Sequence, residues 1–251
     1  MKRQVLAFDL DNTLAASKSP ITARMGGLLD GLLKRFQVCV ISGGKFEQFD
    51  KQLLNHLRAA PRTLGALHVM PTCGTRYFRF NVAANAWRQV YAEDLTADQR
   101  ARIVSVLDDA ADTLGYREKK LWGSQIEDRG SQVTFSALGQ EAPVNRKEAW
   151  DPDGTKKRRL RDYVAKAIPE FEVRVGGSTS IDVTEHGIDK AYGIRKLIAL
   201  LGVKKKDVLF VGDRLGKGGN DYPVKAMGVD CLEVSGWRDT ALIIQTVLDV
   251  V

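Results

Sequence analysis

The sequence predicts an α/β fold, a Rossmann-like parallel-sheet core with an inserted α+β cap domain. Two observations predict the core. Short apolar runs at 5–8, 38–41 and 208–211 are typical of strands buried on both faces of a parallel sheet. Amphipathic patterns such as 21–35 and 45–58 lie between such runs and predict the helices that connect parallel strands by right-handed crossovers. A third observation, hairpin patterns in the middle of the chain, predicts the insert.

The remaining core elements follow the same strand–helix order. Residues 66–70 form a third short strand pattern after the second helix. Near the C-terminus an apolar-periodic helix is closed by Gly202, a residue suited to the position just after a helix. The other predicted elements there are a helix at 191–201, a helix at 221–227, a strand at 229–234 and a helix at 238–250.

The middle of the chain alternates hairpins with separate helices, which is an antiparallel α+β pattern. The sequence Thr96-Ala-Asp-Gln99 is a capping box that opens a helix ending near Gly115. The predicted elements are hairpins at 76–80 with 86–90, at 121–127 with 131–136 and at 171–175 with 180–184, and a helix at 155–167. We therefore expect a core of residues 1–80 and 186–251 and a cap of residues 81–185.

The composition is that of a soluble globular protein. The chain has 251 residues, of which 44% are hydrophobic and 27% charged, and no apolar run approaches the roughly 20 residues that cross a bilayer. The N-terminal apolar stretch ends at Asp9, too early for a signal peptide. Cys39, Cys73 and Cys231 are widely separated, which excludes a disulfide framework and a cysteine zinc site. We expect a cytoplasmic protein without a membrane span.

The net charge of +7 indicates anionic partners. The expected cap has 16 Lys/Arg and 18 Asp/Glu, a net charge of −2, so the core has 38 − 16 = 22 basic and 31 − 18 = 13 acidic residues, a net charge of +9. The basic runs at 156–159 and 204–206 adjoin helical patterns and have few aromatic neighbours. We interpret both as solvated helix ends and expect a small anionic metabolite, not nucleic acid.

Carboxylates gather where two predicted parallel strands end. Asp9 and Asp11 leave the first strand, and Asp213, followed by Asn220 and Asp221, leaves another. Ligands of open α/β sheets bind at this edge, and converging carboxylates repel one another. A hard dication such as Mg²⁺, with oxygen ligands, resolves that repulsion. The sequence therefore predicts a magnesium site.

Two further features suit a phosphate group. The segment Ser42-Gly43-Gly44 precedes a predicted helix, where backbone N–H groups and a hydroxyl can surround a phosphate. Lys190 lies just before another helix, where its ammonium can neutralise phosphate charge.

These residues carry a resemblance. Asp9-Leu10-Asp11-Asn12-Thr13-Leu14 resembles the first motif of the haloacid dehalogenase-like phosphotransferases. The strand leading into Ser42, the isolated Lys190, and Gly212-Asp213 with Asn220-Asp221 are similar to the other three motifs, in the family's order.

The long spacer between Gly212-Asp213 and Gly218-Gly219-Asn220-Asp221 resembles the eukaryotic-type phosphomannomutases. Residues 176–183, 187–190 and 125–130 are also similar to that family. The resemblance spans nearly the whole chain, and the insert corresponds to the substrate-binding cap of those enzymes.

The resemblance implies roles in the core. Asp9 would be the nucleophile and Asp11 the general acid/base. Mg²⁺ would be held by Asp9, the backbone carbonyl of Asp11 and Asp213. Ser42, with Gly43 and Gly44, and Lys190 would hold the transferring phosphate. Asn220 and Asp221 would orient Lys190 or metal-bound water, with Asn220 also among the substrate-binding residues and Asp221 also among the metal-binding residues.

The cap would contribute Arg129, Arg146, Ser180 and Asp182 to substrate binding. The chain departs from the mutases in three ways. Gln140 stands where they have a further arginine, the stretch from there to Arg146 is one residue shorter, and the second motif reads Ser-Gly-Gly where they place glycine first. A mutase must bind a bisphosphate in two orientations, so the lost guanidinium favours hydrolysis or altered specificity.

We therefore expect a Mg²⁺-dependent phosphohydrolase of a small sugar phosphate, monomeric or homodimeric, that acts through an aspartyl-phosphate. A hexose-phosphate mutase, specifically a phosphomannomutase, is the first alternative. A non-catalytic module that binds sugar phosphate or nucleic acid is the second, and it would need no nucleophile–acid pair such as Asp9 and Asp11.

Overall fold

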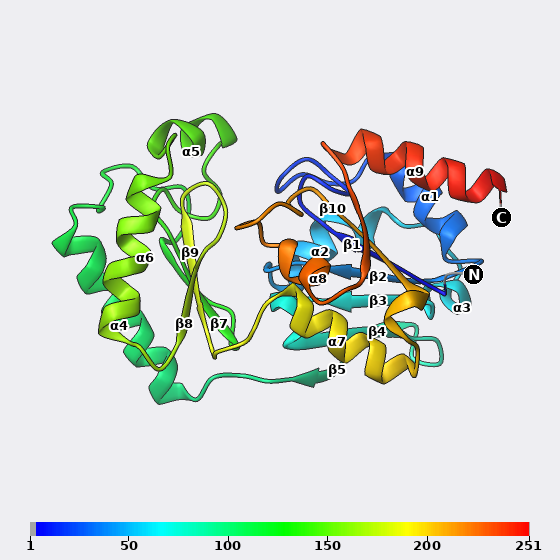
Figure 1. Ribbon diagram of the computed structural model, residues 1–251, viewed down its shortest axis with the longest axis horizontal. Helices are drawn as coiled ribbons and strands as arrows, with labels where there is room; N and C mark the ends of the chain where they lie inside the picture. The colour runs from blue at the N-terminus through cyan, green and yellow to red at the C-terminus, as the bar shows by residue number, and fades with distance from the viewer. Residues whose placement is uncertain (1–3, 251) are drawn as a thin grey trace. The chain divides into compact units, whose positions relative to one another are not determined.

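The computed structural model describes residues 4–250 and divides into two compact units (Figure 1). The core unit comprises Met1–Ala92 and Asp189–Val251, and the insert unit comprises Glu93–Ile188. The expected parallel-sheet core and inserted α+β domain are both present.

A seven-stranded sheet forms the centre of the core unit. Its order is β11-β10-β1-β2-β3-β4-β5, parallel from β11 to β3 and antiparallel from β3 to β5. The register pairs Asp9 with Ile41 and Phe8 with Val211, so β1, β2 and β10 end at the same edge. The strands are β1 (Val5–Asp9), β2 (Gln37–Ile41), β3 (Leu67–Met70), β4 (Arg76–Asn81), β5 (Ala86–Ala92), β10 (Val208–Gly212) and β11 (Asp230–Glu233).

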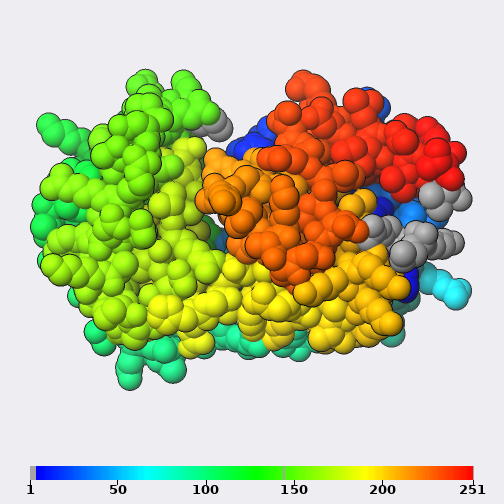
Figure 2. Space-filling model, viewed as in Figure 1, coloured from blue at the N-terminus to red at the C-terminus, as the bar shows by residue number. Residues whose placement is uncertain are grey.

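Helices cover both faces of this sheet because its central strands are apolar on both sides. Leu6 and Phe8 face one apolar layer and Val5 and Ala7 face the other. Each large apolar side chain buried in this way stabilises the fold by about 1.5–3 kcal/mol. The first layer contains α1 (Ala23–Leu32), α2 (Phe46–Gln52) and α9 (Trp237–Val250), and the second contains α7 (Lys190–Leu201) and α8 (Tyr222–Ala226). The space-filling view shows α9, in red, on the surface of the core unit (Figure 2).

The insert unit is a four-stranded antiparallel sheet of order β6-β7-β9-β8. In β7, Val133 and Phe135 alternate with Gln132, Thr134 and Ser136. The apolar residues pack against two helices, so the sheet's other face is polar. The elements are α4 (Ala97–Thr113), β6 (Ile126–Asp128), β7 (Gln132–Ser136), α5 (Val144–Trp150), α6 (Thr155–Ala167), β8 (Glu172–Val175) and β9 (Ser180–Thr184), with α4 and α6 in the apolar layer.

Most predicted elements are present. The capping box of Thr96 and Gln99 opens α4, and Gly202 closes α7 with a left-handed φ of 64°. The hairpin at 76–90 is present, but both of its strands extend the core sheet. The compact insert therefore begins at Glu93 and ends at Ile188, whereas the sequence pattern predicts residues 81–185.

Several short elements were not predicted. The expected helix at 45–58 ends at Gln52 and continues as a 3₁₀ turn, Leu54–His56. Other short elements are α3 (Pro61–Leu64), α5 and the 3₁₀ turns Thr72–Gly74 and Lys205–Asp207. Within the described residues, no helix combines the length and apolarity needed to cross a membrane.

Candidate active site

Three aspartates meet at the carboxyl edge of the core sheet. Asp9 ends β1, Asp213 follows β10, and Asp221 precedes α8. One carboxylate oxygen from each lies within 4.8 Å of the others. Because β1 and β10 are adjacent parallel strands, the fold itself brings Asp9 and Asp213 together.

Lys190 completes this cluster from α7. Its Nζ lies 2.5 Å from Asp9 Oδ1 and 2.6 Å from Asp221 Oδ1, and its side chain is 1% exposed. The Asp189 side chain caps the same helix by accepting a hydrogen bond from the Tyr192 N–H, which fixes where α7 begins. Burial by itself lowers the pKa of Lys190, but the attraction of Asp9 and Asp221 outweighs it and raises that pKa.

The cluster carries more negative than positive charge. Burial raises the pKa of the Asp9 carboxyl to about 8, although the attraction of Lys190 opposes the shift. The pKa of Asp213 is also raised, mainly by burial and secondly by repulsion from Asp221. Three carboxylates and one ammonium sum to −2 when all are ionised. A divalent cation balances that charge, and carboxylate oxygens are the donors that Mg²⁺ prefers. The residues present therefore fit a Mg²⁺ ion.

Glycines allow the chain to approach this cluster closely. A Cβ on Gly212 would lie 2.5 Å from Asp221 Oδ2, so only glycine at the end of β10 leaves room for that carboxylate. A Cβ on Gly74 would overlap the Cα of Gly193, which lies one turn after Lys190 in α7. The turn after β3 and the first turn of α7 are thus in direct backbone contact.

Ser42 lies directly after β2 and is 6% exposed. Its Oγ accepts a hydrogen bond from the Gly44 N–H, at 3.2 Å, and its hydroxyl can still donate to an anion. The turn after β3 holds this loop in place, because the Cys73 N–H donates to the Ser42 carbonyl at 2.9 Å and the Thr72 N–H donates to the Gly44 carbonyl at 3.0 Å.

Asp11 is half-buried, and its side chain is not a member of the aspartate cluster. Its Oδ1 accepts hydrogen bonds from the Lys18 backbone N–H at 2.7 Å and from Gln52 Nε2 at 3.3 Å. Its Oδ2 accepts one from Gln48 Nε2 at 2.8 Å. Sequence reasoning missed both glutamines, although their spacing of four residues on the predicted helix places them on one face.

Asn220 differs from its neighbour. Its side chain is exposed, whereas Asp221 is fully buried and accepts hydrogen bonds from Lys190 and from the Arg214 N–H. Of the two residues expected to orient Lys190, Asp221 is the one that contacts it.

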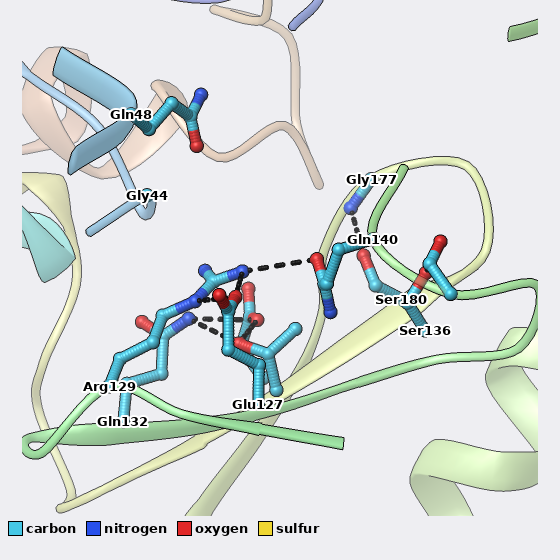
Figure 3. A network of polar contacts seen from close by, with 12 residues as sticks. Gly44, Gln48, Glu127, Arg129, Gln132, Ser136, Gln140, Gly177 and Ser180 are labelled. Atoms are coloured by element: carbon cyan, nitrogen blue, oxygen red, sulfur yellow. Dashed lines mark hydrogen bonds and ion pairs between the residues drawn. The ribbon is translucent and has the colours of Figure 1, made fainter. Parts of the chain in front are cut away.

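Arg129 lies in the insert unit and is 8% exposed (Figure 3). Its Nε donates a 2.7 Å hydrogen bond to Glu127 Oε2, and the same carboxylate oxygen lies 2.7 Å from Nη2. Its Nη2 also donates to Gln140 Oε1 at 3.3 Å. The charge of Arg129 is thus compensated by Glu127, a partner that sequence reasoning missed.

The polar face of the insert sheet fixes two further predicted residues. Asp182 Oδ1 accepts hydrogen bonds from Gln132 Nε2 at 2.8 Å and from the Thr134 hydroxyl at 2.7 Å. The Ser180 Oγ accepts one from the Gly177 N–H at 2.8 Å. The polar positions of the alternating pattern at 132–136 are the signal that could have predicted these partners. Arg146 is instead exposed on α5.

Comparison with known proteins agrees with this arrangement. A family model described as eukaryotic phosphomannomutase matches residues 25–250. The chain is 23% identical to a phosphomannomutase of Encephalitozoon cuniculi over 89% of this chain and 84% of that protein. It is also 23% identical to a probable phosphomannomutase of Caenorhabditis elegans, over 89% and 87% of the two chains.

Solved structures share the fold. An IMP-nucleotidase from Plasmodium falciparum superimposes with a TM-score of 0.70 and 17% identity, covering 99% of this chain and 69% of that one. A haloacid dehalogenase-like hydrolase from Bacteroides thetaiotaomicron superimposes with a TM-score of 0.65 and 18% identity, covering 98% of this chain and all of the other.

Proposed function

The chain belongs to the eukaryotic phosphomannomutase family, within the haloacid dehalogenase-like phosphotransferases, and from that premise we propose that it is a Mg²⁺-dependent phosphohydrolase of a small sugar phosphate. One observation carries the proposal. The carboxylates of Asp9, Asp213 and Asp221 converge at the end of the parallel strands around the buried ammonium of Lys190. Burying these charged groups together destabilises the fold unless a cation neutralises the carboxylates and an anionic substrate binds the ammonium.

In the proposed reaction, Asp9 attacks the phosphorus atom and an aspartyl-phosphate forms as the bond to the sugar oxygen breaks. Asp11 gives a proton to the departing oxygen. It then takes a proton from the water that attacks the aspartyl-phosphate, and inorganic phosphate leaves. Ser42 and Lys190 hold the phosphoryl oxygens through a hydroxyl and an ammonium that the loop and α7 fix in place.

Asp9, Asp213 and the backbone carbonyl of Asp11 would hold the Mg²⁺ ion. When bound, the ion offsets the negative charge of the phosphoryl group and of the carboxylates. Asp221 orients the lysine. Its Oδ1 accepts a hydrogen bond from Lys190 Nζ, and its Oδ2 accepts one from the Arg214 N–H, which fixes the carboxylate.

The insert unit supports hydrolysis over mutase activity. Arg129 shares its charge with Glu127, and Gln140 supplies a neutral carboxamide beside it. This pair of side chains presents less positive charge than two free guanidinium groups would. We therefore propose that the insert selects the neutral part of a sugar monophosphate through Arg129, Ser180 and Asp182.

Phosphomannomutase activity is the second candidate, and the family match favours it. The two activities share the aspartyl-phosphate and differ in whether water or a sugar hydroxyl accepts the phosphoryl group. The products of one substrate therefore separate them.

Mannose 1-phosphate, supplied with Mg²⁺ and with or without a hexose bisphosphate, is the test. A hydrolase releases inorganic phosphate in both mixtures, whereas a mutase forms mannose 6-phosphate and depends on the bisphosphate. Asp9→Asn is the control, since it keeps the shape of the side chain and removes the nucleophile. Release of phosphate at the wild-type rate by Asp9→Asn would overturn the proposed mechanism.

A further inference from the structure

Gln48 and Gln52 lie on the same face of α2, and both carboxamides reach Asp11. With the Lys18 backbone N–H they place three donors on one carboxyl group, two on Oδ1 and one on Oδ2. Donors on both oxygens fix the plane of the carboxyl group as well as its position. Asp11 is thereby held more closely than a half-buried side chain at a turn would be on its own.

The orientation of Gln48 is itself fixed. Its Oε1 accepts a hydrogen bond from Lys18 Nζ at 2.8 Å, which leaves Nε2 to face Asp11. The backbone of Lys18, which donates to Asp11, has a left-handed φ of 58°. Gly44 leaves room for the carboxamide, because a Cβ on Gly44 would overlap Gln48 Oε1.

The carboxamide nitrogen of Gln52, and not its oxygen, faces Asp11. Its Nε2 donates to the Ser19 carbonyl at 2.8 Å and to Asp11, so both neighbours are acceptors and the amide has one favourable orientation. Its Oε1 is buried and has no hydrogen-bond partner among the described residues. This orientation directs the nitrogen of the Gln52 carboxamide, and not its oxygen, at Asp11.

We propose that Gln48 and Gln52 are positioning residues that orient the carboxyl group of Asp11 for proton transfer to and from the substrate oxygen. The proposal rests on the proposed function. As the Asp9–phosphorus bond forms, the phosphorus–oxygen bond to the alcohol breaks, its electron pair stays on the alcohol oxygen, and that oxygen takes the proton of Asp11. The carboxylate then left on Asp11 keeps its three donors until water returns a proton.

This role predicts a dependence on the leaving group. A sugar alkoxide needs a proton as it leaves, whereas 4-nitrophenolate leaves without one. The value of kcat/KM covers the steps up to departure of the alcohol and omits hydrolysis of the aspartyl-phosphate. Misplacement of Asp11 should therefore lower kcat/KM for a sugar phosphate and leave kcat/KM for 4-nitrophenyl phosphate nearly unchanged.

The experiment compares Gln48→Met, which keeps the side-chain length and removes the amide, with Glu47→Met at the exposed neighbouring position of α2. We expect Gln48→Met to lower kcat/KM for mannose 1-phosphate about 10- to 100-fold, the cost of a misplaced catalytic group. In an Asp11→Asn background the same substitution should have no further effect, because the two residues act as one unit. Glu47→Met should match the wild type on both substrates.

The outcomes separate the two proposals. Equal losses on both substrates, or a full additional loss in the Asp11→Asn background, would overturn the positioning role while leaving the hydrolase intact. A wild-type protein that cleaves no phosphate monoester would overturn the proposed function. In that case urea unfolding of Gln48→Met, Asp11→Asn and the double variant decides whether Gln48 holds Asp11. If the shifts of the unfolding midpoint in the two single variants simply add in the double variant, the contact between Gln48 and Asp11 is contradicted.

Discussion

The ammonium of Lys190 lies 2.5 Å from the carboxylate of Asp9, and neither side chain is more than 5% exposed. The two residues lie far apart in the sequence, Asp9 at the end of β1 before the insert and Lys190 at the start of α7 after it. Their contact joins the segments before and after the insert into one site. Removal of either partner leaves buried charge without its counterion, which links catalysis here to stability.

Lys190→Met tests this link. The variant leaves Asp9 and Asp221 repelling each other, so we expect the free energy of unfolding at pH 8 without Mg²⁺ to fall by about 3 kcal/mol. Phosphatase turnover should fall as well, because the phosphoryl group loses its cation. Urea unfolding measures the first effect, with exposed Lys51→Met as the control. A loss as small as that of Lys51→Met would contradict the buried ion pair.

Mg²⁺ should be required for activity and should stabilise the core unit. Chelation should abolish turnover and Mg²⁺ should restore it, because the cation balances the excess negative charge at Asp9, Asp213 and Asp221. At a Mg²⁺ concentration about 100 times its Kd, binding should add about 2.7 kcal/mol to stability, seen as a rise in Tm.

Asp213→Asn should greatly reduce that Mg²⁺-dependent rise in Tm, whereas exposed Asp249→Asn on α9 should leave it unchanged. Turnover that survives exhaustive chelation would rule out the proposed metal site.

Substitutions in the insert should separate binding from chemistry. Arg129→Ala removes a charge-assisted contact worth about 1.5–3 kcal/mol, or roughly 10- to 150-fold in kcat/KM for a sugar phosphate. An aryl phosphate, which lacks the sugar, should be affected much less. Arg129 also forms an ion pair with Glu127, so Arg129→Ala leaves the Glu127 carboxylate without that partner. The double variant Glu127→Gln with Arg129→Ala removes the unpaired charge as well and is the matched control for stability. Equal losses on both substrates would show that Arg129 supports the fold and not the substrate.

The residue at position 140 should influence the product. Gln140→Arg adds a second guanidinium beside Arg129, which favours retention of a bisphosphorylated intermediate. We expect the ratio of mannose 6-phosphate to inorganic phosphate to rise in the presence of a hexose bisphosphate. Gln140→Lys, which adds charge without the planar fork, is the comparison. An unchanged ratio in both variants would mean that Gln140 does not decide between water and sugar as acceptor.

The parallel core was predictable because its strands are apolar on both faces and end in polar motifs, as at Asp9 and Gly212. Parallel pairing then brings Asp9 and Asp213 to one edge without further information. The assignment of the hairpin at 76–90 was less accessible, because its pattern is the same whether it pairs with the core sheet or with the insert.

Partners of the site residues were harder to predict than the residues themselves. Gln48 and Gln52 are ordinary polar residues whose roles depend on which turn lies opposite α2. The same holds for the close contact of Gly74 with Gly193, which places α7 and therefore Lys190. Tertiary packing sets these contacts, and the sequence pattern around each residue does not indicate which distant segment it will face.

His68 in β3 should make the stability of the core depend on pH. Its ring is fully buried, with Nδ1 2.7 Å from the Tyr77 hydroxyl and Nε2 2.8 Å from Gln37 Oε1. Burial, with Arg79 nearby, lowers the pKa of His68 to about 3. Above the ordinary histidine pKa of about 6.5 the ring is neutral in both the folded and unfolded states, so it adds no pH dependence there.

Below pH 6.5 the unfolded state binds a proton that the folded state excludes, so stability should fall as the pH falls towards 3. Between pH 7.5 and pH 5.0 the loss from this residue should be about 2 kcal/mol. His68→Gln has no titrating ring and should lose that much less over the same interval in urea unfolding. His56→Gln, at an exposed position, should follow the wild-type slope. Parallel pH profiles for the wild type and His68→Gln would show that the buried ring gains its proton without unfolding.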